Sequence, residues 1–371
     1  MRRRSFLRAG ARWLAAPAAL QAMDRPMARA DGRYPGVSPE DRIVFPRDFG
    51  AHPDFRSEWW YITGWLRAAG PGQADPAANG EFGFQITFFR ARTTHDDRNP
   101  SRFAPRQLIL AHAVLALPAR QRLMFEEKAA RTGFDYAGAD QRDTAVSVGR
   151  WSLNRTHDDR YVARIVAREF DLDLELSTDR PPALQGVAGY SRKGPRPEQA
   201  SHYYSRPQLR VTGSVKSNTT GQRPVQGIAW LDHEWSSEIL DERAAGWDWI
   251  GLNLDDGTSL MAFRIRGRDQ SIVWSHARFV GQPESAAPQP VFEPLRLWRS
   301  ARTGVRYPVA MRVTVGARVF ELQPLFDDQE LDARASTGTI YWEGAVRVLE
   351  SGRPVGRGYL ELTGYAAPVK I

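Results

Sequence analysis

The feature of this 371-residue sequence that most limits its possible folds is an internal repeat. The stretch 58–66, EWWYITGWL, matches the stretch 246–254, GWDWIGLNL, at two aromatic positions, one isoleucine and the final leucine. Three more matches follow in the same order, namely an apolar segment ending in arginine (82–90 and 259–264), a small-His-Ala step (111–113 and 275–277) and an Arg-Pro-Val start (223–225 and 353–355). A spacing of about 130 to 190 residues indicates two copies of one domain rather than a solenoid of short units.

Each copy consists of short segments in which apolar and polar side chains alternate, separated by turns rich in glycine, proline and charge. Alternation with a period of two indicates β-strands, and long helical periodicity is scarce. Without crossover helices the strands must be joined by short connections, which favours antiparallel β-barrels or sandwiches. A short helix around 121–131 is the one exception that we expect. The predicted fold class is all-β, and a barrel of about eight strands has room inside for one small ligand.

The N-terminus shows the signals of a twin-arginine export peptide in the right order. Arg3 and Arg4 precede Ser-Phe-Leu-Arg, an apolar run covers 13–23, and Ala-Arg-Ala at 28–30 fits a cleavage site. The run is too short and too rich in alanine for a membrane span, and a basic amphipathic helix is the alternative. We therefore expect residues 1–30 to be a signal peptide and the protein to be periplasmic or secreted.

Removing this segment changes the charge of the protein. The whole chain carries 51 basic and 43 acidic side chains, a net charge of +8, and seven arginines and one aspartate of these lie in residues 1–30. A remainder near +2 argues against a nucleic-acid partner. The sequence contains no cysteine, which excludes disulfides and thiolate metal sites and suits an oxidising compartment. It also lacks the H-E-x-x-H metal motif, so we expect no metal. We further expect the protein to be a monomer.

The most unusual polar run is Asp232, His233 and Glu234, which stands between Trp230 and Trp235. Because side chains alternate along a strand, His233 and Trp235 share one face, and Asp232 and Glu234 share the other with Trp230. Titratable groups between indoles suit proton chemistry in an apolar setting, and a hydrogen-bonded strand end facing solvent is the alternative. The second copy has no counterpart of this run, which favours a specialised site in or at the edge of the first domain.

The same alternation turns Glu58 and Trp60 toward the aliphatic inner face of their strand, and Asp248 toward the corresponding face of the second copy. A carboxylate that enters an apolar interior needs a partner or a proton. Arg56 is the nearest candidate partner for Glu58. A salt bridge that seals the barrel end is the alternative to a catalytic role.

Three further residues are candidates for a ligand site. His112 lies on an apolar face and matches His276 in the repeat, which favours a structural role, although it could also line a cavity. His202 and Tyr204 lie one hairpin away from His233, and we expect them to converge on it.

Four motifs together resemble the family of carotenoid 1,2-hydratases and AttH-like proteins. They are RSEWWYITGWL at 56–66, HYYS at 202–205, WLDHEW at 230–235 and GWDW at 246–249. The resemblance covers nearly all of the chain after the signal and implies two consecutive lipocalin-like antiparallel β-barrel domains, which we place at 36–240 and 241–371. It also implies a long apolar ligand, either an isoprenoid or a lipid.

The resemblance leaves the activity open between several functions. Some members add water to a terminal isoprenoid double bond without a cofactor, and others are secreted hydrolases. Others occur with lipid-type export systems, so a non-catalytic lipid or isoprenoid carrier that works with an ABC-type exporter is the alternative. Fungal relatives bind or cyclise apolar polyenes. A third reading is a scaffold in which the polar run only fixes the contact between domains.

In the hydratases a His-x-Trp element and a downstream Asp beside an aromatic residue carry the function, and the matching residues here are His233, Trp235, Trp247 and Asp248. Hydrating an alkene requires a strong acid, a stabilised carbocation and a placed water. A desolvated carboxylic acid keeps its proton, so the resemblance makes Asp232 or Asp248 the expected donor. Indole faces stabilise cations, and His233 would orient the acid or hold the water.

The site prediction has a geometric form. At least one carboxylate is expected within hydrogen-bonding distance of His233 or His202, facing a concave pocket lined by tryptophan. The candidates for this carboxylate are Asp232, Glu234 and Asp248.

Overall fold

The computed structural model describes residues 34–69, 80–96, 98–218, 221–238, 240–281 and 289–369. The predicted signal peptide at 1–30 lies outside the described residues. Strands dominate this part of the chain, and its helices are the three-residue 3-10 helices η1 (Arg47–Phe49) and η2 (Pro118–Arg120). The all-β prediction is confirmed. A search of the described helices found none with the length and hydropathy of a membrane span.

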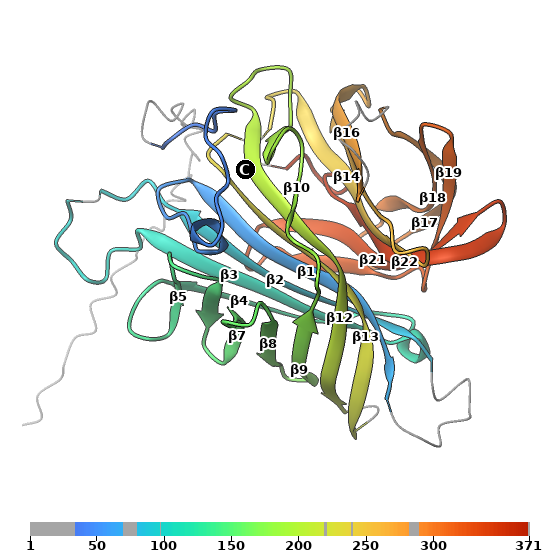
Figure 1. Cartoon of the computed structure of the whole chain (residues 1–371), viewed down its shortest axis with the longest axis horizontal. Helices are drawn as coiled ribbons and strands as arrows, with labels where there is room; N and C mark the ends of the chain where they lie inside the picture. The colour runs from blue at the N-terminus through green and yellow to red at the C-terminus, as the bar shows by residue number, and fades with distance from the viewer. Residues whose placement is uncertain are drawn as a thin grey trace, which may run out of the picture. The chain divides into compact units, whose positions relative to one another are not determined.

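The first sheet has thirteen antiparallel strands and nearly closes into a barrel (Figure 1). Its path runs β4-β3-β2-β1-β13-β12-β9-β8-β7-β6-β5, and β10 and β11 pair with β12. The end strands approach each other, since β5 and β6 contact β3 and β6 contacts β4. The strands are β1 (Ser57–Ala68), β2 (Phe82–Arg92), β3 (Gln107–Ala116), β4 (Met124–Arg131), β5 (Ala137–Ala139), β6 (Ala145–Val148), β7 (Trp151–Arg155), β8 (Tyr161–Val166), β9 (Phe170–Ser177), β10 (Ala183–Leu184), β11 (Tyr190–Arg192), β12 (Ala200–Ser217) and β13 (Gly221–Ser236).

The second sheet has nine strands and remains open, as half a barrel (Figure 1). Its path runs β16-β15-β14-β22-β21-β19-β18-β17, and β20 pairs with β21. The two sheets are consistent with the two lipocalin-like barrels implied by the resemblance. The strands are β14 (Ala244–Leu254), β15 (Ser259–Gly267), β16 (Ile272–Val280), β17 (Val291–Arg299), β18 (Arg306–Val315), β19 (Arg318–Pro324), β20 (Glu330–Ala333), β21 (Thr339–Glu350) and β22 (Arg353–Leu362).

The repeat read from the sequence is visible in the strand pairing. In each sheet the first strand lies between the second strand and the last strand, because β1 pairs with β2 and β13, and β14 pairs with β15 and β22. The carboxylate on the first strand faces an arginine at the end of the second, Glu58 opposite Arg90 and Asp248 opposite Arg264. These pairs make Glu58 the structural counterpart of Asp248, whereas the alignment of the two sequence copies matched Asp248 with Trp60, two residues later. A shift of two residues keeps every side chain on its predicted face.

Both faces of β1 are buried, against different partners. One face carries Trp60 and Ile62 into the core of the first sheet, and the other carries Tyr61 and Trp65 into a cluster shared with the second sheet. The Trp65 indole N–H donates to the Gly358 carbonyl at 3.0 Å. The second face is therefore a packed contact between the sheets, and the part of the chain from Tyr34 to Ile371 is one compact unit.

The expected helix around 121–131 is wrong, because Met124–Arg131 forms β4 and pairs with β3 along its whole length. The charged run Glu126, Glu127 and Lys128 lies on a strand at the end of the sheet path. Charged side chains are common on such strands because they discourage pairing with other chains. Three consecutive charged residues lack the alternation of apolar and polar side chains, so the sequence did not indicate a strand here.

Candidate functional site

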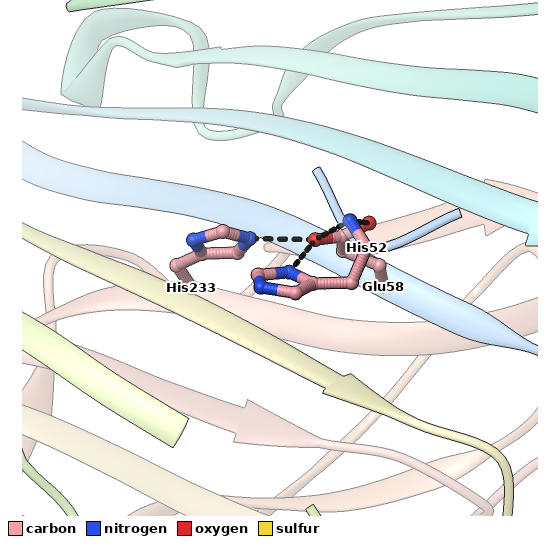
Figure 2. A group of neighbouring side chains, drawn as sticks. All are labelled: His52, Glu58 and His233. Atoms are coloured by element: carbon pink, nitrogen blue, oxygen red, sulfur yellow. Dashed lines mark hydrogen bonds and ion pairs between the residues drawn. The ribbon is translucent and has the colours of Figure 1, made fainter. Parts of the chain in front are cut away.

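A buried polar cluster inside the first sheet is formed by His52, Glu58 and His233 (Figure 2). Glu58 on β1 faces inward, as the alternation predicted, and His233 on β13 does so too; neither is exposed to solvent. The His52 Nδ1 and His233 Nε2 atoms lie 2.8 and 2.9 Å from the same carboxylate oxygen, Glu58 Oε1. The backbone N–H of His52 also donates to this carboxylate, at 2.9 Å from Oε2.

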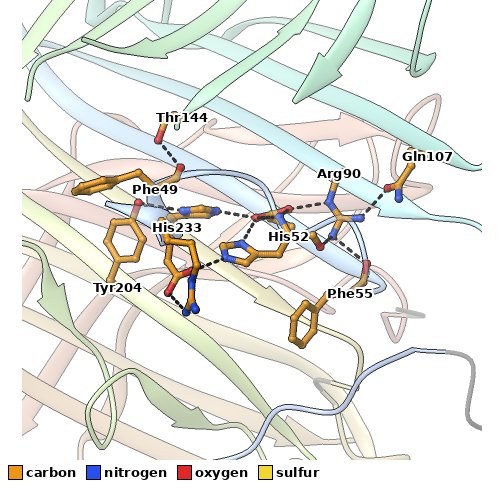
Figure 3. A network of polar contacts seen from close by, with 11 residues as sticks. Phe49, His52, Phe55, Arg90, Gln107, Thr144, Tyr204 and His233 are labelled. Atoms are coloured by element: carbon orange, nitrogen blue, oxygen red, sulfur yellow. Dashed lines mark hydrogen bonds and ion pairs between the residues drawn. The ribbon is translucent and has the colours of Figure 1, made fainter. Parts of the chain in front are cut away.

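Arg90 supplies the fixed positive charge of the cluster. Its Nε donates to Glu58 Oε2 at 2.7 Å, and its Nη2 donates to the carbonyls of His52 and Phe55 at 2.9 Å each (Figure 3). The expectation that Arg56 pairs with Glu58 is wrong, because Arg90 stands directly opposite Glu58 in the β1–β2 register. Burial alone would raise the pKa of Glu58, but the hydrogen bonds from His233 and His52 hold it well below its ordinary value. Glu58 is therefore a carboxylate.

The outer nitrogens of the two imidazoles have different partners. His52 Nε2 lies 3.3 Å from Asp48 Oδ1, and His233 Nδ1 lies 3.0 Å from the Tyr204 hydroxyl. Burial lowers the pKa of His233 to about 4, so this ring is neutral near pH 7. Burial also opposes charge on His52, but the hydrogen bonds to Asp48 and Glu58 outweigh it and raise the His52 pKa. The two histidines that share one carboxylate thus differ in their affinity for a proton.

Aromatic rings close around the cluster. The Trp60 ring stacks on His233 with centroids 4.8 Å apart, and the Trp235 ring stacks on His52 at 3.7 Å. Phe45 and Phe49 lie edge-on to Tyr204. His233 therefore lies among packed rings and is fully buried on this side of β13.

Asp232 points in the opposite direction, into the contact between the two sheets. Its oxygens accept hydrogen bonds from the Tyr203 hydroxyl at 2.8 Å, from Ser205 at 2.5 Å and from the Trp230 indole at 2.7 Å. The Trp249 indole donates to the same Tyr203 hydroxyl at 3.2 Å. Burial raises the pKa of Asp232 to about 7 despite these three bonds.

Glu234 lies on the same face as Asp232 and is ion-paired with Lys193 at 2.8 Å. The nearby His202 is neutral near pH 7 because burial lowers its pKa to about 4, and its Nδ1 has no hydrogen-bond partner among the described residues. Among the described residues, neither Asp232 nor Glu234 forms the expected hydrogen bond with His233 or His202. Both ring nitrogens of His233 are occupied by Glu58 and Tyr204, and alternation along β13 sends its two neighbours to the other face.

The remaining predicted residues lie in other parts of the fold. Asp248 faces the interior of the second sheet, between Arg264 at 2.6 Å and Arg266 at 3.0 Å, so its contact with His233 is also wrong. Trp247 faces the opposite side and donates to Glu361 Oε1 at 3.0 Å. His112 bonds across the contact between the sheets, with Nδ1 at 2.8 Å from the Tyr341 hydroxyl, outside both groups.

Comparisons with known proteins now identify the family. The AttH-like family model matches residues 36–365. The chain belongs to the AttH-like family. Its sequence is 49% identical to an AttH protein from Nitrosomonas europaea, whose crystal structure has a TM-score of 0.79 and is matched over 89% of this chain and 99% of that chain.

Two more distant crystal structures share the fold of this AttH-like protein. Kievitone hydratase from Nectria haematococca is 14% identical with a TM-score of 0.65, over 90% of this chain and 96% of that chain. The CghA protein, solved with Sch210972, is 13% identical with a TM-score of 0.53, over the same shares. A search of curated proteins found no match.

In this AttH-like protein the contact between the sheets holds more acids than Asp232. We call Asp232, Glu343 and Glu361 the intersheet acids. Burial raises the pKa of Glu361 to about 7 and that of Glu343 well above its ordinary value. Tyr61 lies close enough to all three for their charges to raise its pKa further, beyond the effect of its burial.

Two polar atoms around the intersheet acids, Gln85 Oε1 and Tyr359 Oη, are buried without a hydrogen bond to any described residue. Tyr61 Oη and Glu343 Oε1 form no hydrogen bond of standard geometry either, but they lie close enough to each other to affect the pKa of both groups. Each buried polar atom left unpaired costs about 1–3 kcal/mol, so native proteins rarely keep several together. These atoms lie on strands of both sheets, Gln85 on β2 and Tyr359 on β22, at the contact between the sheets.

His52, Glu58 and His233 are residue types that bind metal ions, and their potential ligand atoms lie within 4.8 Å of one another. Ligands of one zinc ion stand about 3.3 Å apart, since each lies about 2.0–2.2 Å from the metal in a tetrahedral arrangement. The separations of 2.8 and 2.9 Å are those of direct hydrogen bonds, and Arg90 already occupies the other carboxylate oxygen. The geometry of the cluster is explained by hydrogen bonds alone.

Sequence reasoning missed several residues of both groups. Arg90 could have been found, because both copies of the repeat end their second apolar segment with an arginine. His52 and Asp48 lie in a segment without periodicity, and nothing local marks them as partners of β1. Glu343 and Glu361 join the intersheet acids only through the packing of one sheet on the other.

The stability of the protein should depend on pH through Asp232. Burial raises its pKa from 3.8 to about 7, so its contribution is fully present below the unfolded value and is lost as pH rises through the folded value. From about pH 4 to about pH 8 the wild type should therefore lose about 2–4 kcal/mol of unfolding free energy relative to Asp232→Asn. Urea denaturation at each pH measures this difference, and a constant difference would show that Asp232 is already ionised in the folded state.

Proposed function

We propose that the protein is an exported hydratase-like enzyme that adds water to a double bond of a long apolar ligand, an isoprenoid or a lipid, between its two sheets. Asp232 is the acid. The observation that carries the proposal is the buried Asp232 carboxyl group, whose pKa of about 7 lets it hold a proton near neutral pH. The membership of the AttH-like family supports hydratase- or hydrolase-type chemistry in general.

The residues around Asp232 suit each step of the addition. The proton of the carboxyl group is transferred to one alkene carbon, and the other carbon becomes a tertiary carbocation. The indoles of Trp230 and Trp249 point their N–H groups at Asp232 and at the Tyr203 hydroxyl, and a carbocation lying over the face of either ring would be stabilised. A water molecule then forms the C–O bond and returns one proton to the Asp232 carboxylate. The reaction consumes one alkene and one water and regenerates the acid, without a cofactor.

The unpaired polar atoms support the same location. A chamber for water addition must hold a water molecule beside an apolar chain, and a buried water needs two to four polar partners. Among the described residues, Gln85 and Tyr359 each offer one buried polar atom without a partner at the contact between the sheets, and the Tyr61 hydroxyl and the Glu343 carboxyl group lie beside each other there.

The test is to identify the bound molecule and follow its conversion. Ligands extracted from the purified protein are identified by mass spectrometry and incubated with the protein in D₂O. Hydration predicts a product heavier by one water, with one deuterium bonded to carbon, because the proton from Asp232 exchanges with solvent. Hydrolysis of an ester would give no new C–D bond. Recovery of the ligand unchanged would contradict the proposal and identify the carrier function.

A further inference from the structure

Two exposed phenylalanines stack on each other at one end of the first sheet. Phe103, in the loop between β2 and β3, is 67% exposed, and Phe134, in the turn between β4 and β5, is 50% exposed. Their ring centroids lie 5.3 Å apart, and Tyr136, two residues after Phe134 in the chain, is 54% exposed. The loop that carries Phe103 extends beyond the end of the sheet (Figure 1). We call Phe103, Phe134 and Tyr136 the aromatic patch.

Two arginines frame the aromatic patch. The Arg131 guanidinium lies 5.0 Å from the centre of the Phe103 ring and 4.5 Å from that of Phe134, and the Arg102 guanidinium lies 5.6 Å from Phe134. Within the described part of the chain neither arginine forms an ion pair with a carboxylate. A guanidinium stacked on a ring keeps its N–H groups free to bind phosphate oxygens. The patch therefore combines exposed rings with two positively charged side chains, although Arg131 also donates to the Arg102 carbonyl at 3.5 Å and the exposed Asp135 lies in the same turn.

The backbone beneath Phe134 is strained. Phe134 and Asp135 have φ angles of 60° and 55°, in the left-handed region that bulky side chains rarely adopt. Glycine or asparagine would fit this turn at a lower cost and would expose less apolar surface. The contacts of Phe134 with Phe103 and the two arginines hold this turn together, but they leave half of its side chain exposed at the cost of a strained backbone, which points to a role outside the fold.

We propose that the aromatic patch and its two arginines dock the protein on an anionic lipid surface. Aromatic side chains partition into the headgroup region of a bilayer, and arginines near the surface are attracted to anionic headgroups. Three rings on two loop tips match shallow insertion into a membrane. A stable protein interface needs about 800 Å² from each partner, with twenty or more residues. A patch of three rings and two arginines is smaller than that, which favours a lipid surface over a protein partner. The docking rests on these surface residues alone and does not depend on the chemistry of Asp232.

Vesicle binding tests the proposal, with vesicles of phosphatidylcholine with or without phosphatidylglycerol. The protein is used both as the full chain and from residue 31, since the seven arginines in residues 1–30 would themselves attract anionic lipid. In co-sedimentation, Phe103→Ser/Phe134→Ser should lower the partition coefficient about tenfold or more. Arg102→Gln/Arg131→Gln should remove the preference for phosphatidylglycerol.

Two controls separate docking from folding and from general surface hydrophobicity. Val291→Ser/Leu297→Ser removes two apolar side chains of similar exposure, 53% and 51%, from β17 and should leave binding unchanged. Phe134→Asn relieves the strained turn, so it should weaken vesicle binding without lowering the melting temperature. Equal binding by the patch and β17 variants, or no binding by the protein from residue 31, would overturn the proposal. In the second case the patch would be assigned to a protein partner.

Discussion

Replacing Glu58 with glutamine is expected to lower the free energy of unfolding by about 3–5 kcal/mol. The glutamine would leave Arg90, which is 3% exposed, without a buried negative charge, and would present an amide N–H₂ to donors that now share one carboxylate. Glutamine has only one acceptor oxygen, so either the His52 and His233 rings on Oε1 or Arg90 Nε and the His52 backbone N–H on Oε2 would lose their acceptor. Urea denaturation of the two proteins at pH 7 measures the effect.

The matched control is Glu169→Gln, which removes the same charge from an exposed pair. Glu169 lies 3.2 Å from Arg120, with side chains 56% and 38% exposed, so its loss should change stability by no more than about 0.5 kcal/mol. If Glu58→Gln also stays within about 1 kcal/mol of the wild type, the cluster does not depend on a buried carboxylate.

The second large effect is on turnover. Once the ligand is identified, Asp232→Asn should lower the rate of hydration about 10²–10⁴-fold, because an amide cannot give a proton to carbon. The fold should survive, since asparagine has nearly the shape of the protonated acid and can still accept from Tyr203 or Ser205. Steady-state kinetics and the melting temperature, measured together, separate loss of chemistry from loss of structure.

The pH profile provides the control for this variant. The wild-type rate should fall as pH rises through about 7, where Asp232 loses its proton, and the residual rate of Asp232→Asn should lack this decline. A variant that keeps at least half of the wild-type rate would exclude Asp232 as the acid. Attention would then turn to Glu361, whose pKa burial also raises to about 7.

The fold could be predicted to a large extent, because its signals are local or repeated. Alternation placed Glu58 and Trp60 on the inner face of β1, and the repeat anticipated that β1 and β14 occupy equivalent places in their sheets. The open form of the second sheet could not be predicted. Closure depends on how closely the end strands β16 and β17 approach each other, and the alternation of residues along a strand does not indicate that distance.

The site was predicted less well, for two physical reasons. Alternation already assigned His233 and Asp232 to opposite faces of β13, so expecting them to act together conflicted with the strand geometry itself. The true partners of His233 come from elsewhere, Glu58 on β1 and Tyr204 on β12, and the partners of Asp232 face a second sheet. Contacts between distant segments depend on packing, which a single sequence does not display. The domain limits and the export signal stay predictions.

The pairing of β1 with β13 has a consequence for how the protein is made. Glu58 and His233 are separated by 175 residues, so β1 lacks one of its two neighbours until nearly two thirds of the chain has been synthesised. Contacts of such long range form slowly, and unpaired strand edges invite aggregation. Trp59, Trp60 and Trp65 would be exposed on the nascent chain during this time. We therefore expect the first sheet to close only after β13 leaves the ribosome, and the yield of folded protein to depend on chaperones that cover β1 during translation.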